Sequence, residues 1–147
     1  MTIATPRRVA IIGGNRIPFA RSNTAYSHAS NHNLLTAALQ GLVDRFQLQG
    51  QRLGEVAGGA VMKHTRDYNL VREAVLSTTL SPQTPAFDLQ QACGTGLEAI
   101  RFLLDADEEL RRRQHRLDGA LDAGIEVTLC TALGVDREQR LHLRVGD

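Results

Sequence analysis

Hydrophobic and polar residues follow two different spacings along the first hundred residues of this chain. Short apolar runs occur at residues 7–14 (RRVAIIGG), 54–63 (GEVAGGAVMK) and 85–91 (PAFDLQQ), and each is bounded by glycine, proline or polar residues. Runs of this length and composition predict strands. The first run, which is β-branched and closed by a glycine pair, is expected to be a buried strand.

Between these runs, apolar residues recur every three or four positions, as they do on one face of an amphipathic helix. The pattern predicts a helix over residues 31–46, for which Ser30 or Asn31 is a suitable N-cap. A second helix is expected over residues 69–80. A third begins at or near Cys93 and is expected to continue through the charged residues as far as position 121. The apolar stripe of the first helix consists of Leu35, Leu39, Leu42 and Phe46, widened by Leu34, Ala38 and Val43.

The order strand, helix, strand, helix, strand, helix predicts an α/β layered fold with right-handed crossovers. A change of composition near residue 100 divides the chain in two. Residues 1–100 hold eight arginines and six acidic residues, whereas the much shorter segment 101–147 holds eight and ten. We therefore expect one α/β unit over residues 1–100. The rest is expected to be a charged tail with a helix, a weak strand over residues 124–135 and a weakly structured end.

Composition restricts the class of protein further. A chain of 147 residues with 42% hydrophobic and 22% charged residues is typical of one globular domain. A net charge of +1 gives no electrostatic reason to expect a nucleic acid or membrane partner. No apolar run approaches the length of a membrane span, and no export signal is recognisable. We therefore expect a cytoplasmic protein whose two cysteines, Cys93 and Cys130, are reduced thiols.

Candidate chemistry is concentrated in residues 90–100, QQACGTGLEAI, where Cys93 lies between a predicted strand and a predicted helix. A helix N-terminus favours the thiolate form of a cysteine, and the thiolate is the nucleophile. Gly94 and Gly96 would let the backbone bend and a substrate approach, and backbone N–H groups there could stabilise an oxyanion. The alternative is a small buried cysteine with a structural role, and spacing alone leaves both interpretations open.

Two segments resemble the thiolase family. QQACGTGLEAI is similar to the nucleophile motif of thiolases, and VAIIGGNRIPFAR is similar to their opening strand and the turn that follows. The resemblance covers residues 7–100 and implies a thiolase-like layered fold with an incomplete first βαβαβα half. It also implies that Cys93 is acylated by an acyl-CoA thioester, in Claisen condensation or thiolysis. Coenzyme A thioesters would be substrates, and no separate cofactor or metal is implied.

The family also uses a histidine in a Gly-His-Pro segment and a second cysteine in a Cys-x-Gly segment. Neither segment occurs in these 147 residues: proline follows neither His115 nor His142, and Cys130 is followed by Thr131 and Ala132. Because condensation needs bases as well as a nucleophile, we carry over Cys93 alone. We expect little or no turnover from this chain, and self-association through apolar surface that a complete layered fold would cover.

Several alternatives remain open at this stage. Residues from 101 onward are either a shifted reading frame or truncated gene end, or a natural charged helix that diverged; the nucleotide sequence after codon 100 would distinguish these. A ketoacyl synthase shares the fold and an active cysteine, but Gly94-Thr95-Gly96 differs from its usual motif. A non-catalytic α/β interaction module is the other rival. His28 and His32, the pair with metal-ligand spacing, are better explained by a solvated loop.

Overall fold

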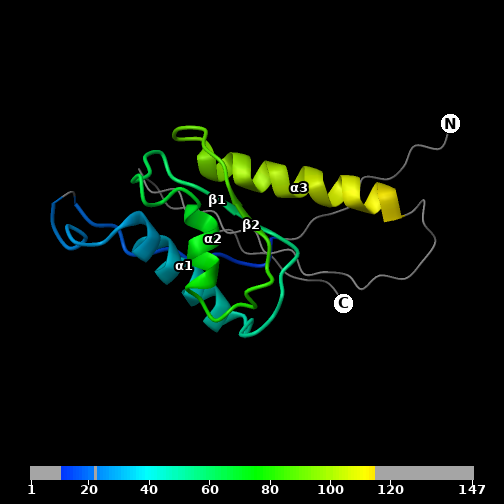
Figure 1. Ribbon diagram of the computed structural model, residues 1–147, viewed down its shortest axis with the longest axis horizontal. Helices are drawn as coiled ribbons and strands as arrows, with labels where there is room; N and C mark the ends of the chain where they lie inside the picture. Colours follow the sequence, from blue (N-terminus) through cyan, green and yellow to red (C-terminus); the bar gives the residue numbers. More distant parts are fainter. Residues whose placement is uncertain (1–10, 22, 115–147) are drawn as a thin grey trace.

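The computed structural model describes residues 11–21 and 23–114, and it arranges them in three layers. Figure 1 shows a short sheet with α3 on one side and with α1 and α2 on the other. The predicted strand at 124–135, Cys130 and the expected helix beyond residue 114 lie outside the described residues. The elements in chain order are α1 (Asn31–Arg45), β1 (Val56–Gly58), α2 (Leu70–Leu76), β2 (Ala86–Asp88) and α3 (Thr95–Gln114).

The two strands pair in parallel, with Val56 opposite Ala86 and Ala57 opposite Phe87. Successive residues of a strand point to opposite faces of its sheet. Val56 and Ala86 accordingly pack with the cluster formed by α1 and α2. Ala57 and Phe87 join a second cluster, which α3 completes with Ala99 and Leu103. The alternation of faces therefore divides the core into two parts and confirms the predicted α/β layered architecture.

The first predicted helix is confirmed, and its N-cap is Ser30. The Ser30 hydroxyl accepts a hydrogen bond from the backbone N–H of Asn33 at 3.1 Å, and Asn33 Oδ1 accepts one from the Ser30 N–H at 3.0 Å. This reciprocal pair is a capping box, with asparagine in the place of the more common glutamate. Five residues of the predicted apolar stripe form the buried face of the helix: Leu35, Ala38, Leu39, Leu42 and Val43. The other two, Leu34 and Phe46, are partly buried.

The prediction of a buried first strand is wrong for the part of residues 7–14 that the structure describes. Residues 11–14 form no strand, and Ile11 and Ile12 are 42% and 45% exposed. The polar groups that follow bond to α1 instead of to a neighbouring strand. The Gly14 carbonyl accepts from Arg45 Nη1 at 3.0 Å, and Asn15 Nδ2 donates to the Ala38 carbonyl at 2.9 Å. Within residues 11–15, these bonds run to α1 and not to a strand.

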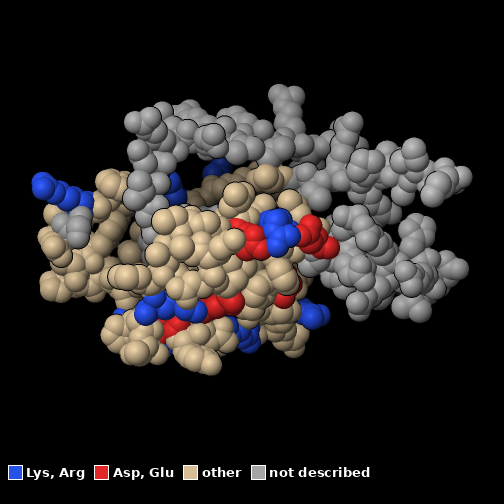
Figure 2. Space-filling model, turned by 90° about the horizontal axis from the view of Figure 1, so that it is seen from above, with Lys and Arg blue, Asp and Glu red and all other residues tan. Residues whose placement is uncertain are grey.

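Two large apolar side chains of α3 are exposed. Leu97 is 73% exposed and Phe102 is 43% exposed, although Phe102 makes an edge-on contact with Phe87. Most described side chains on the face seen in Figure 2 are neither acidic nor basic. No helix within residues 11–21 and 23–114 is long and apolar enough to cross a bilayer. Self-association through this surface stays a prediction, which sedimentation of the purified chain would test.

Candidate active site

Cys93 lies in the turn between β2 and α3, two residues before the helix begins at Thr95. This confirms the predicted strand-to-helix position. Cys93 is exposed, so the interpretation as a buried structural cysteine is wrong. An exposed sulfur that follows the carboxyl end of a parallel strand lies at the edge where open α/β sheets bind their ligands.

The sharp bend of this turn is made by Ala92 and not by a glycine. Ala92 has φ +43°, a left-handed backbone conformation that residues other than glycine rarely adopt. The Gly94 N–H donates to the Gln91 carbonyl at 2.8 Å, and the Thr95 N–H donates to the Ala92 carbonyl at 3.3 Å. The expectation that glycine supplies the bend is therefore wrong. A Cβ at Gly94 would instead lie 3.3 Å from the Gln91 carbonyl oxygen, so this glycine allows the turn to close tightly.

The side chain of Thr95, the first residue of α3, forms hydrogen bonds with two residues at the start of the turn. Its hydroxyl oxygen accepts from the Gln91 N–H at 2.9 Å and donates to the Ala92 carbonyl at 2.8 Å. Thr95 is only 4% exposed. Sequence reasoning missed this residue. The signal that was available is a threonine at the start of a predicted helix, because threonine hydroxyls commonly bond backbone groups there.

Gly59 brings the end of β1 against this turn. A Cβ built on Gly59 would lie 2.0 Å from the Leu89 carbonyl oxygen and 3.0 Å from the Thr95 Cγ2 methyl. The first distance is far inside van der Waals contact, so only glycine fits here. A glycine pair inside a strand is usually expected to weaken it. In the structure, the backbone at Gly59 lies close to the backbone of Leu89 and to Thr95, the first residue of α3.

The charges that follow Cys93 most closely in sequence belong to the first turns of α3. Glu98 accepts a hydrogen bond from Arg101 Nε at 2.9 Å, and Arg101 Nη1 donates to Asp105 at 2.6 Å. The bond from Arg101 lowers the pKa of Glu98 below its ordinary value, so Glu98 is a carboxylate at neutral pH and its charge is balanced by the guanidinium. No described residue forms a hydrogen bond with the Cys93 side chain. The described part of the chain therefore shows a positioned thiol without a bonded base.

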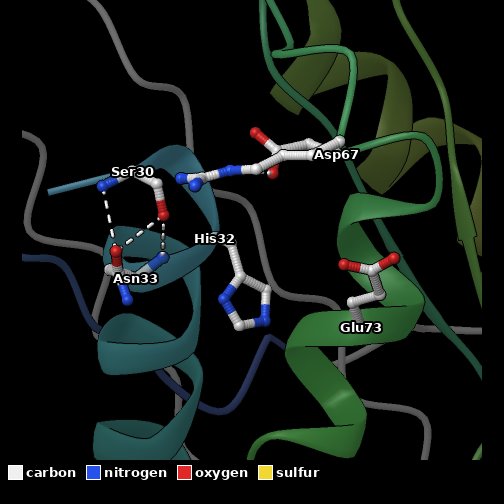
Figure 3. A pocket seen from close by; sticks show the side chains of 6 residues that line it. Ser30, His32, Asn33, Asp67 and Glu73 are labelled. Atoms are coloured by element: carbon white, nitrogen blue, oxygen red, sulfur yellow. Dashed lines mark hydrogen bonds and ion pairs between the residues drawn. The ribbon is translucent and has the colours of Figure 1, made fainter.

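A separate polar pocket of about 290 Å³ lies between the start of α1 and the start of α2. In Figure 3 the His32 ring points between the two helices, and its Nε2 lies 3.1 Å from the Ser77 hydroxyl. Asp67 is 2% exposed, and its Oδ2 has no hydrogen-bond partner among the described residues. No group of three or more metal-ligating side chains is found within the described ranges. The residues that line the pocket are Ser30, His32, Asn33, Arg66, Asp67 and Glu73.

Comparison with known proteins identifies the family. The family model "Thiolase, N-terminal domain" matches residues 9–114. The chain belongs to the thiolase family. This confirms the resemblance carried by the Cys93 motif and the opening segment, and it favours a thiolase over a ketoacyl synthase. The matched segment includes residues 101–114, so the change of composition at residue 100 falls inside it.

Individual thiolase-family relatives agree with this assignment. The chain is 34% identical over 101 residues to the human mitochondrial trifunctional enzyme subunit beta, covering 67% of this chain and 21% of that protein. It is 34% identical over 93 residues to a 3-ketoacyl-CoA thiolase of Photorhabdus laumondii, covering 63% of this chain and 21% of that protein. The chain therefore spans about a fifth of the length of these relatives.

A solved structure supports the thiolase-like fold. The chain resembles the crystal structure of the Bacillus anthracis acetyl-CoA acetyltransferase with a TM-score of 0.51 and 22% sequence identity, over 65% of this chain and 23% of that one. At this identity the likeness concerns the fold alone. It confirms the predicted fold class, a partial thiolase-like α/β fold.

Proposed function

We propose that Cys93 is the nucleophile that accepts an acyl group from an acyl-CoA thioester. The Cys93 sulfur would form a bond with the acyl carbon, the bond between that carbon and the sulfur of coenzyme A would break, and coenzyme A would leave with a proton. The observation that carries the proposal is an exposed cysteine in the strand-to-helix turn of a thiolase-family chain. A thiol there is accessible to a substrate and lies two residues before α3 begins.

The wider reaction class is reversible Claisen condensation of acyl-CoA units, or thiolysis of 3-ketoacyl-CoA in reverse. We propose that this chain completes neither reaction alone. Carbanion formation requires a base, and the 147 residues contain no Gly-His-Pro or Cys-x-Gly segment. A thiol without its partner groups can be acylated, but removing one member of a cooperative catalytic set lowers turnover by orders of magnitude. The cytoplasmic location of the protein remains a prediction.

Acylation can be tested on the purified chain with acetyl-CoA. We expect one acetyl group on the Cys93 peptide in mass spectra, removed by neutral hydroxylamine as a thioester is. The chain offers a matched control, because Cys93→Ala should abolish the modification and Cys130→Ala should leave it unchanged. Equal labelling of both cysteines would indicate non-specific chemistry. That result, or the absence of any label on Cys93, would contradict the proposed function.

Turnover is tested separately by following thiolysis of acetoacetyl-CoA in the presence of free coenzyme A. We expect the rate with the chain to equal the rate with its Cys93→Ala variant, since the groups that complete the reaction are missing from these residues. Sustained, Cys93-dependent thiolysis over many turnovers would show that the chain supplies its own bases. The claim of an incomplete catalytic set would then be wrong, while acylation of Cys93 would stand.

A further inference from the structure

We infer that Thr95 is a positioning residue for Cys93, because its side chain holds the turn in which the cysteine lies. The inference rests on the proposed role of Cys93 and adds a residue that acts through the backbone, without contact with substrate. Its basis is geometric: Thr95 bonds the strained residue, Ala92, and the residue before it, Gln91, and it packs against the end of β1.

The hydroxyl group and the methyl group of Thr95 both contact neighbouring residues. The hydroxyl accepts from the Gln91 N–H at 2.9 Å and donates to the Ala92 carbonyl at 2.8 Å, so its one donor and one of its acceptor sites are used inside the turn. The Cγ2 methyl faces Gly59, where an added Cβ would be only 3.0 Å away. With the residue 4% exposed, water has little access to these bonds. The side chain is thereby held in one rotamer.

The turn needs such a restraint because Ala92 is strained. A left-handed conformation brings the alanine Cβ close to backbone atoms, and it persists only where the surroundings compensate. The strain of one such residue is of the same order as the net stabilisation from two hydrogen bonds, and both bonds of Thr95 are partly buried. Both bonds of Thr95 end on the residues that form the bend, Gln91 and Ala92. Thr95 therefore supplies the compensation at the position where the strain arises.

Cys93 depends on this restraint because it follows Ala92 directly. The bonds from Gln91 to Thr95 enclose the cysteine in a closed loop of five residues. If the hydroxyl were lost, Ala92 could relax to negative φ, and the chain before α3 would turn the Cys93 side chain away from its present direction. Serine at position 95 would keep both bonds, whereas valine would keep the shape and lose them.

The test is the rate at which iodoacetamide alkylates Cys93 in the full 147-residue chain at pH 7, with the Cys93 and Cys130 peptides counted separately. Thr95→Val is expected to lower the Cys93 rate about fivefold or more, the equivalent of one net hydrogen bond. Thr95→Ser is expected to stay within about twofold of the parent chain, because it restores the hydroxyl. A Thr95→Val rate within twofold of the parent, in a chain that is still folded by circular dichroism, would overturn the inference.

A double-mutant cycle separates positioning from general stability. Glycine adopts left-handed φ without strain, so Ala92→Gly removes the need for the restraint. In that background Thr95→Val is expected to change the Cys93 rate by less than about twofold. If Thr95 were only a packing residue, the two substitutions would lower the melting temperature independently, and the effect of valine on Cys93 would be the same in both backgrounds. That outcome would overturn the inference.

A measurement on the unmutated chain covers the case in which Thr95→Val does not fold. Gln91 is exposed, so its amide would exchange rapidly with solvent unless the Thr95 hydroxyl holds it. Slow exchange of the Gln91 N–H supports the restraint, and exchange at the rate of an unprotected amide overturns it.

The outcomes of these experiments are independent of acyl transfer. If Cys93 takes no acyl group but its alkylation depends on Thr95, the proposed function fails and the positioning role holds.

Discussion

Replacing Gly59 with alanine is expected to lower the free energy of unfolding by roughly 3 kcal/mol, because the new methyl group would collide with backbone. The added Cβ would lie 2.0 Å from the Leu89 carbonyl oxygen. Leu89 cannot move away freely, since its N–H is bonded to the Gly58 carbonyl at 2.9 Å as the parallel pairing continues past β2. Relief would require separating β1 from β2, and this would also disturb the Thr95 contact.

Gly14→Ala is the matched control for this substitution. No atom of the described residues lies within 4 Å of a Cβ at Gly14, so the same chemical change is expected to leave stability unaltered or raise it by about 0.5 kcal/mol. Denaturant unfolding followed by circular dichroism measures both variants. If Gly59→Ala were as stable as Gly14→Ala, the close approach of Gly59 to Leu89 would not exist in solution. The described packing between the strands and α3 would then be wrong.

Asp88→Ala is the second substitution with a large expected effect, about 3 kcal/mol of lost stability. Asp88 ends β2, and its carboxylate accepts from the backbone N–H groups of Leu70 at 2.8 Å and Val71 at 2.7 Å, the first two residues of α2. It also pairs with Lys63, whose Nζ lies 2.9 Å from Oδ2. Asn69 makes no side-chain capping bond, so alanine at position 88 would leave two helix N–H groups and a half-buried ammonium unpartnered.

Two further variants define what Asp88 contributes. Asp88→Asn keeps the shape and one acceptor oxygen, so it is expected to recover part of the loss. Asp44→Ala is the surface control: Asp44 is exposed, and the hydrogen bonds that its carboxylate accepts from described residues come from the side-chain amides of Gln40 and Gln49. Its removal is expected to cost about 0.5 kcal/mol or less. Thermal unfolding would contradict this account if Asp88→Ala behaved like Asp44→Ala.

The helices show which parts of the fold could be predicted from sequence. The N-cap of α1 and its buried face depend on residues three or four apart, so Ser30 and the apolar stripe were sufficient. The start of α2 was located correctly, but its cap could not be predicted. The residue that caps it, Asp88, is eighteen positions further along the chain and reaches α2 only because β2 pairs with β1.

The strands show why short apolar runs are weaker predictors. Residues 54–63 and 85–91 each contain a strand, though each strand is only three residues long. Residues 11–14 have the same apolar character and lie beside α1 instead, where Phe46 meets Gly13 and Arg45 bonds Gly14. The composition of a short segment indicates whether it tends to be extended and buried. Whether it pairs as a strand depends on whether the edge of another strand lies beside it in the fold.

By itself, the sequence determined where the three described helices begin, two of the three predicted strands and the place of Cys93 between a strand and a helix, because these follow from periodicity and from a motif of adjacent residues. The tertiary structure decided what holds that cysteine. Gly59 lies thirty-six residues from Thr95, and the two meet only when parallel pairing brings β1 beside β2. The left-handed Ala92 likewise persists only because bonds around it offset its strain. Contacts of this kind have no periodic signature in one chain, since their partners are brought together by the fold.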